Sequence, residues 1–115
     1  MIRLGVLGST RGTDLQAILD AIDSKLLESK LSVVISNKKT AFILERANKH
    51  KIPSYSISHK NINRETFDRK ITKLLKKHKV DLVLLIGFMR ILSKSFCQDW
   101  KGKILTVHPS LLPKY

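Results

Sequence analysis

The sequence is poor in cysteine, in acidic residues and in long apolar runs. Its single cysteine, Cys97, excludes an internal disulfide and indicates a reducing, cytoplasmic location. No apolar run approaches the roughly 20 residues that span a bilayer. The first residues, MIRLGVLG, lack the basic region and cleavage site of a signal peptide. No linker or low-complexity segment divides the chain, so we expect one domain over residues 1–115 and no membrane partner.

The shortage of acidic residues leaves a strong positive charge. Nine acidic residues stand against 22 lysines and arginines, and the net charge of +13 indicates anionic partners such as nucleic acid or phosphorylated metabolites. Lysines outnumber arginines sixteen to six, whereas sequence-reading DNA surfaces favour arginine. We therefore favour a lysine-rich surface that only contacts solvent, and keep nucleic-acid binding as the less favoured alternative. The densest group of lysines is predicted on the outer side of a helix: Lys70, Lys73, Lys76, Lys77 and Lys79.

Strand and helix patterns alternate along the whole chain. Apolar and β-branched runs predict five strands, at 2–7, 31–35, 54–57, 81–86 and 104–107. Apolar residues at helical spacing predict four helices, at 13–27, 40–50, 63–78 and 93–100. The inward-facing residues of the first three helices would be Leu15, Ile18, Leu19, Ile22 and Leu26, then Ala41, Leu44 and Ala47, then Phe67, Ile71, Leu74 and Leu75. This alternation predicts an α/β protein with a doubly wound, mostly parallel sheet.

The first candidate site follows the first predicted strand, in the sequence GSTRGTDLQ at 8–16. Glycines there let the backbone approach a ligand closely, and Thr13 with Gln16 fits a capping box at the start of a helix. Free amides, the helix dipole and Arg11 would favour an anion such as phosphate. The pattern is neither a Walker A motif nor the dinucleotide fingerprint, so an ordinary strand-to-helix turn is the alternative.

The second candidate site is GFMRIL at 87–92, after the fourth predicted strand. Apolar residues around one arginine, Arg90, suit a flat ligand that also offers hydrogen-bond acceptors. The alternative is a hydrophobic turn that packs on the next helix.

The third candidate site ends the last predicted strand, in the sequence TVHPS at 106–110. Thr106 and His108 are two apart on a strand, so their side chains would face the same way. A hydroxyl can stabilise the oxyanion of a carbonyl that becomes tetrahedral, and an imidazole can give or relay a proton. A structural histidine at a strand end is the alternative.

The remaining histidines and the cysteine carry no comparable pattern. His50, His59 and His78 lie in polar stretches without metal-ligand spacing and are predicted on the surface. Cys97 lies in a predicted helix with no histidine nearby, and we expect it to pack in the interior.

Together the motifs resemble those of the phosphoribosylglycinamide formyltransferases, the folate-dependent transformylases of purine synthesis. The matching segments are GTDLQAILDAI, SNKKTAFILERA, NRETFDR, DLVLLIGFMRILS and HPSLLPKY, in that order along nearly the whole chain. The methionyl-tRNA formyltransferases differ at GFMRIL, and the formyltetrahydrofolate deformylases differ at the histidine motif. The resemblance implies the N-terminal nucleotide-binding domain of a formyltransferase-like fold, a Rossmann-type half that is truncated after the fifth strand.

The resemblance also implies a reaction and a set of residues. The amine of glycinamide ribonucleotide would attack the formyl carbon of 10-formyltetrahydrofolate, the co-substrate, and no metal would be needed. Gly12, Thr13 and Asp14 lie where the family holds the ribonucleotide phosphate. Arg64 and the stretch Met89, Arg90, Ile91 and Leu92 lie where it holds the folate. His108 matches the catalytic histidine, and Thr106 stands beside it in place of an asparagine.

The sequence departs from the family in two motifs and in length. Thr13-Asp14 replaces Ser-Asn, Thr106 replaces the asparagine, and the family's catalytic aspartate comes later than the last residue here. We therefore expect these 115 residues to transfer formyl groups poorly or not at all. The alternatives are a catalytically incomplete phosphate- or nucleotide-binding module and a fragment of a longer protein. Exposed sheet surface would favour a homodimer.

Overall fold

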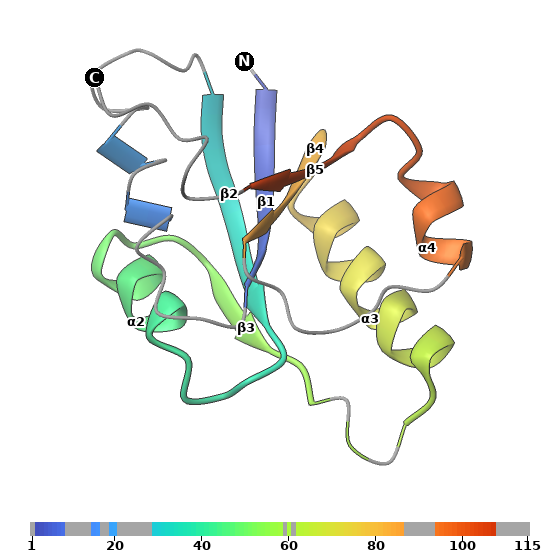
Figure 1. The fold of residues 1–115 in the computed structure, drawn as a ribbon. Coiled ribbons are helices and arrows are strands. Elements are labelled where there is room, and N and C mark those ends of the chain that lie inside the picture. Colours follow the sequence, from blue (N-terminus) through green and yellow to red (C-terminus); the bar gives the residue numbers. More distant parts are fainter. Residues whose placement is uncertain are drawn as a thin grey trace.

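In the part of the chain that the structure describes, five parallel strands form one sheet in the order β3-β2-β1-β4-β5 (Figure 1). The computed structural model describes residues 2–8, 15–16, 19–20, 29–58, 60, 62–86 and 94–107. Of residues 106 and 107 it describes the backbone alone. The strands are β1 (Ile2–Gly8), β2 (Ser29–Ser36), β3 (Ser54–Ser56), β4 (Leu82–Ile86) and β5 (Ile104–Val107). Every strand pair is parallel, as the alternation of elements predicts.

The chain builds the sheet outward in one direction and then in the other. From the central β1 it passes to β2 and β3, and then it returns to β4 and β5 on the other side of β1. The order of strands therefore reverses between β1 and β4. In open α/β sheets a ligand-binding crevice forms outside the carboxyl ends of the strands at such a reversal.

Helices cover both faces of the sheet, so the sheet is doubly wound. Helix α2 (Phe42–Lys49) and the helical residues 15–16 and 19–20 lie on one face, and α3 (Arg64–Lys77) and α4 (Lys94–Asp99) lie on the other (Figure 1). Each face has its own apolar cluster, one around Val6, Val34 and Ile43 and one around Val33, Phe67 and Ile71. Among the described residues, no helix has the length and hydrophobicity to cross a bilayer.

The buried faces of α2 and α3 follow the predicted pattern with one omission. In α3, Phe67, Ile71 and Leu75 are fully buried and Leu74 is partly buried against the same cluster. In α2, Ile43 and Ala47 form the buried stripe, whereas the predicted Leu44 is only partly buried. Ile43 was missed because the predicted stripe followed the i, i+3 spacing 41, 44 and 47, whereas the structure buries the i, i+4 pair 43 and 47.

The prediction that Cys97 packs in the interior is wrong. Cys97 lies in α4 as predicted, but it is exposed. The residues of this region that are buried are Phe96 and Trp100, four positions apart, and their ring centroids are 6.2 Å apart. Cys97 follows Phe96 by one position, which places it about 100° around the helix and on the solvent side. The lysine group from Lys70 to Lys79 is exposed, as predicted.

The two longest described helices end in the same way. At the end of α2, the Ile52 amide donates to the Ala47 carbonyl and the Lys51 amide donates to the Asn48 carbonyl. The end of α3 repeats these bonds, from Val80 to Leu75 and from Lys79 to Lys76. Both pairs form a Schellman motif, whose left-handed residue is usually glycine. Here that residue is a lysine, at φ 59° in Lys51 and 57° in Lys79. The left-handed conformation costs a residue with a Cβ about 1 kcal/mol.

Candidate functional site at the carboxyl edge of the sheet

The three strands that precede the sequence motifs end in one row. Gly8, the last residue of β1, pairs with Ile86 at the end of β4, and Ile86 pairs with Val107 at the end of β5. The first motif begins at Gly8 itself, the second begins at residue 87, directly after Ile86, and the third begins at Thr106 and continues past Val107. Parallel strands with aligned ends deliver the chain to one edge, and this edge contains the reversal between β1 and β4.

Most of the predicted site residues lie outside the described part of the chain. These are the phosphate-binding candidates Gly12, Thr13 and Asp14, the folate-binding candidates from Met89 to Leu92, and His108. Their roles stay predictions. The structure fixes the strand ends from which each segment departs, and these ends lie side by side.

Thr106 is the predicted catalytic residue whose backbone is described. It lies in β5 and pairs with Leu85, which in turn pairs with Leu7 of β1. This row is one residue inside the row of strand ends. The prediction that Thr106 belongs to the last strand is confirmed, whereas the orientation of its hydroxyl lies outside the described part.

Gly8 is required by the close packing at the end of β1. A Cβ atom on Gly8 would lie 3.0 Å from the carbonyl oxygen of Ile86 and would collide with the side chain of Ile43. Any larger residue would therefore push β1 away from β4 or displace α2. The absence of a side chain holds the aligned strand ends together at the point where the first motif starts.

Arg64 is the folate-binding candidate that the structure describes in full. It is the first residue of α3 and is exposed. The side chain of Asn63 caps this helix by accepting a hydrogen bond of 2.8 Å from the Thr66 amide. Because α3 connects two parallel strands, it runs antiparallel to them, and its first turn lies toward the carboxyl edge of the sheet. Arg64 is thus on the side of the molecule where the three motifs begin.

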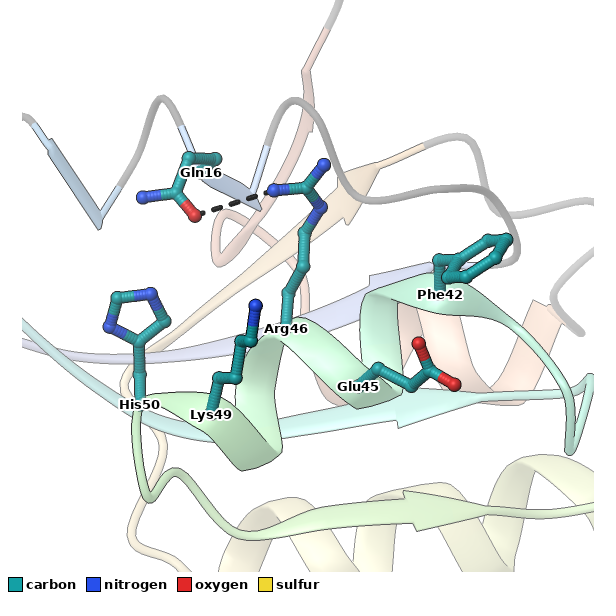
Figure 2. Close-up of a pocket in the computed structure, with 6 residues that line it drawn as sticks. All are labelled: Gln16, Phe42, Glu45, Arg46, Lys49 and His50. Carbon is teal, nitrogen blue, oxygen red and sulfur yellow. Dashed lines mark hydrogen bonds between the residues drawn. The ribbon is translucent and has the colours of Figure 1, made fainter.

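A cavity of about 650 Å³ lies along the outer side of α2 (Figure 2). Figure 2 shows Arg46 reaching from α2 toward Gln16, whose Oε1 accepts a bond of 3.5 Å from the guanidinium. The amide nitrogen of Gln16 donates to Asp20 at 3.0 Å. The Thr13 half of the predicted capping box lies outside the described residues. Of the described residues that line this cavity, none is a predicted catalytic or ligand-binding residue.

The prediction that the histidines lie on the surface is confirmed for His50, whereas His78 is only partly exposed and His59 lies outside the described residues. His50, at the end of α2, is exposed. His78, at the end of α3, is partly buried, and its Nε2 lies 3.0 Å from the hydroxyl of Tyr55. Burial, and then the charge of Lys77, lowers the pKa of His78 from its ordinary value of 6.5. Sequence spacing gave no sign of this contact, because Tyr55 comes from β3, 23 residues earlier.

The fold and the aligned strand ends define a doubly wound α/β protein whose strand order reverses between β1 and β4, the place where open α/β sheets generally bind their ligands. The family model described as formyl transferase matches residues 2–115, and the chain belongs to this family.

Similar proteins of known name agree with this family. The chain is 45% identical to phosphoribosylglycinamide formyltransferase of Haemophilus influenzae, with 100% of this chain and 55% of that protein covered. It is 50% identical to the trifunctional purine biosynthetic protein adenosine-3 of Chironomus tentans, with 98% of this chain and 8% of that protein covered. The structure of glycinamide ribonucleotide transformylase 1 from Symbiobacterium toebii superposes with a TM-score of 0.89, at 38% identity, over 100% of this chain and 55% of that one. The chain thus spans about half the length of the bacterial phosphoribosylglycinamide formyltransferases that it matches.

Proposed function

We propose that the carboxyl edge of this sheet takes part in transfer of a formyl group from 10-formyltetrahydrofolate to the amine of glycinamide ribonucleotide, a step of de novo purine biosynthesis. The observation that supports this most is the row Gly8–Ile86–Val107, from which the three motifs depart together. Relatives at 42–45% identity are named phosphoribosylglycinamide formyltransferase, which adds the reaction and the substrate.

In the proposed reaction the amine nitrogen attacks the formyl carbon and a new carbon–nitrogen bond forms. The carbonyl oxygen becomes an oxyanion, which the hydroxyl of Thr106 would stabilise by donating a hydrogen bond. His108 would take the proton that the attacking amine loses and pass it to the departing nitrogen of the folate. The bond from that nitrogen to the formyl carbon then breaks, and tetrahydrofolate leaves. Protons balance, and the reaction as proposed uses no metal.

The two substrates would approach from different strand ends. Gly12, Thr13 and Asp14, after β1, would hold the phosphate of glycinamide ribonucleotide through backbone amides, since a carboxylate beside a phosphate is repulsive unless it points away. Met89, Arg90, Ile91 and Leu92, after β4, would hold the folate together with Arg64. The exposure of Arg64 at the start of α3 fits this role, because its guanidinium is accessible to a ligand at the same edge.

The proposal limits what these 115 residues do by themselves. They span about half the length of the bacterial relatives, so we expect slow turnover and a measurable affinity for glycinamide ribonucleotide. The proposal keeps the predicted cytoplasmic location and treats nucleic acid as the less favoured partner. It also keeps a homodimer through the sheet, because Leu105 on the edge strand β5 is 53% exposed.

A single-turnover formyl-transfer assay tests the proposal, with calorimetry on glycinamide ribonucleotide and on a folate analogue beside it. We expect His108→Ala to lower the rate by at least 100-fold and to change the ribonucleotide affinity by less than threefold. His50→Ala is the matched control, since this exposed histidine lies at the end of α2, and it should leave the rate unchanged.

Three outcomes decide between the alternatives. An equal rate for the parent chain and His108→Ala would contradict the proposed role of the histidine. Binding of both ligands without turnover would support the catalytically incomplete binding module. If the chain binds neither glycinamide ribonucleotide nor the folate analogue, both the proposed reaction and the binding module are contradicted. For the homodimer, Leu105→Glu should abolish self-association in sedimentation velocity.

A further inference from the structure

A second cavity lies at the opposite, amino-terminal edge of the sheet. It has a volume of about 510 Å³ and is lined by the beginnings of β1 and β2, the residues before β3 and the ends of α2 and α3. This volume is in the range of small-molecule binding sites. The motifs of the formyl transferase reaction begin at the other edge, so this cavity is separate from the proposed site.

The cavity is strongly cationic. Five lysine or arginine residues line it: Arg3, Lys30, Lys51, Lys77 and Lys79. Among the described lining residues there is no carboxylate. Asp81 lies close by, where its Oδ2 accepts a hydrogen bond of 2.9 Å from the Arg3 amide. Helix carboxyl ends attract lysines even without a ligand, so the charge alone does not establish a binding site.

Ser32 supplies a second, independent observation. Leu4 of β1 pairs with Leu31 and Gly5 pairs with Val33, so Ser32 is the extra residue of a β-bulge. Bulges are rare between parallel strands, and they often redirect a side chain beside a functional site. Ser32 lines the cavity and is only 8% exposed, and its Oγ has no hydrogen-bond partner among the described residues. A buried hydroxyl without a partner is rare in folded proteins and requires an explanation.

The two strained lysines provide a third observation. Lys51 and Lys79 hold the left-handed positions of the two helix ends, where glycine would be favoured, and both line the cavity. Strained backbone that persists is associated with functional sites. The same conformation at two helix ends therefore places two lysines in the lining of one cavity.

We propose that this cavity binds a small anion that carries a diphosphate or triphosphate group. Lysine ammonium groups bind phosphate as compact positive charges, and a serine hydroxyl donates a hydrogen bond to a phosphate oxygen. Five cations match an anion of several negative charges better than a single carboxylate. Inorganic pyrophosphate, tripolyphosphate and a nucleoside triphosphate share this chemistry.

Calorimetry at low ionic strength tests the proposal on the 115-residue chain, with inorganic pyrophosphate, tripolyphosphate, ATP and adenosine as probes. We expect saturable binding of one equivalent of the phosphorylated probes and none of adenosine. ATP that binds at least fivefold more tightly than tripolyphosphate would identify a nucleotide as the ligand, and equal affinities would identify the phosphate chain itself. Either result supports the site.

Variants locate the binding. The double variant Lys51→Gly/Lys79→Gly should weaken pyrophosphate binding at least tenfold while the fold is kept, because glycine suits both left-handed positions. Ser32→Ala should weaken it about threefold. The matched control Lys70→Gln/Lys73→Gln removes two exposed charges of α3 that are not among the described lining residues, and it should change the affinity less than twofold.

Contrary results are equally clear. A control variant that loses as much affinity as Lys51→Gly/Lys79→Gly would show a general charge effect and overturn the site. Absence of pyrophosphate and tripolyphosphate binding would also overturn it. So would binding of a DNA duplex with no measurable binding of the small phosphates, which would indicate a nucleic-acid surface instead.

Discussion

The two edges of this sheet differ in what their residues contribute: close backbone packing at the carboxyl edge and charged side chains at the amino edge. At the carboxyl edge, backbone must come close to backbone, and Gly8 permits the aligned ends of β1, β4 and β5. At the amino edge, Lys51 and Lys79 occupy left-handed backbone positions, and both residues line one cavity. The comparison shows that a residue can be chosen either for the side chain it lacks or for the side chain it brings despite a backbone cost.

The largest expected change in stability comes from a substitution at the carboxyl edge. Gly8→Ala should lower the free energy of unfolding by about 2 kcal/mol, because the new Cβ meets Ile43 and the Ile86 carbonyl. In the background of Ile43→Val, which removes the Cδ1 atom, the same substitution should cost clearly less. Urea denaturation of the four proteins of this double-mutant cycle measures the difference. Equal costs in the two backgrounds would show that Ile43 does not restrict this position.

The next effect has the opposite sign and concerns the amino edge. Lys51→Gly and Lys79→Gly should each raise the free energy of unfolding by about 1 kcal/mol, since glycine adopts the left-handed conformation without strain. Thermal unfolding measures the gain as an increase in Tm. Lys51→Ala is the matched control, because it removes the charge and keeps the strain, and it should show no such increase. A Tm that falls in both glycine variants would contradict the assigned strain.

A smaller effect compares the two ends of α3. Asn63→Ala removes the side-chain cap near the carboxyl edge and should cost roughly 0.5 to 1 kcal/mol. Asn63→Ser keeps an acceptor for the Thr66 amide and should retain most of the stability in the same urea titration. Equal losses in both variants would mean that the bond to Thr66 does not carry the effect.

The smallest effect is the pH dependence of stability at His78. The folded chain binds this proton less readily than the unfolded chain, because the pKa of His78 lies below its ordinary value of 6.5. The contribution of His78 to the free energy of unfolding is therefore fully present above pH 6.5. It decreases as the pH falls from 6.5 toward the pKa of His78 in the folded chain. His78→Gln should reduce this decrease in urea titrations between pH 7 and about pH 5. An unchanged pH dependence in His78→Gln would contradict this contribution of His78.

The carboxyl edge was predictable because its signals are local. Each strand is a short apolar run followed directly by its motif, and parallel strands send their ends to one edge whatever the details of packing. The helix predicted at 63–78 is confirmed as α3 for the same reason, since its apolar residues recur at helical spacing, and the structure adds the cap that Asn63 forms. The prediction failed at Ile43 and Cys97, where a rotation of the helix by one residue decides which side chain is buried.

The amino edge was missed because its residues come from four separate segments of the chain. The sequence does repeat a histidine, a lysine and a β-branched residue at 50–52 and again at 78–80, which a search for helix ends could have found. Nothing in that repeat indicates that the two helix ends line one cavity. Ser32 carried no signal either, because a bulge depends on how β2 pairs with β1 and not on the residues of β2 alone.

The amino acid sequence by itself determined the order of strands and helices, the parallel sheet and the three motifs at strand ends. These depend on hydrophobic period and on residues next to one another in the chain. Only the tertiary structure decided the exact row in which β1, β4 and β5 end and the contact of His78 with Tyr55. It also decided that the Ser32 hydroxyl has no hydrogen-bond partner among the described residues, and that Lys51 and Lys79 line the same cavity. These features depend on register and on contacts between residues distant in sequence, which the packing of helices onto the sheet fixes.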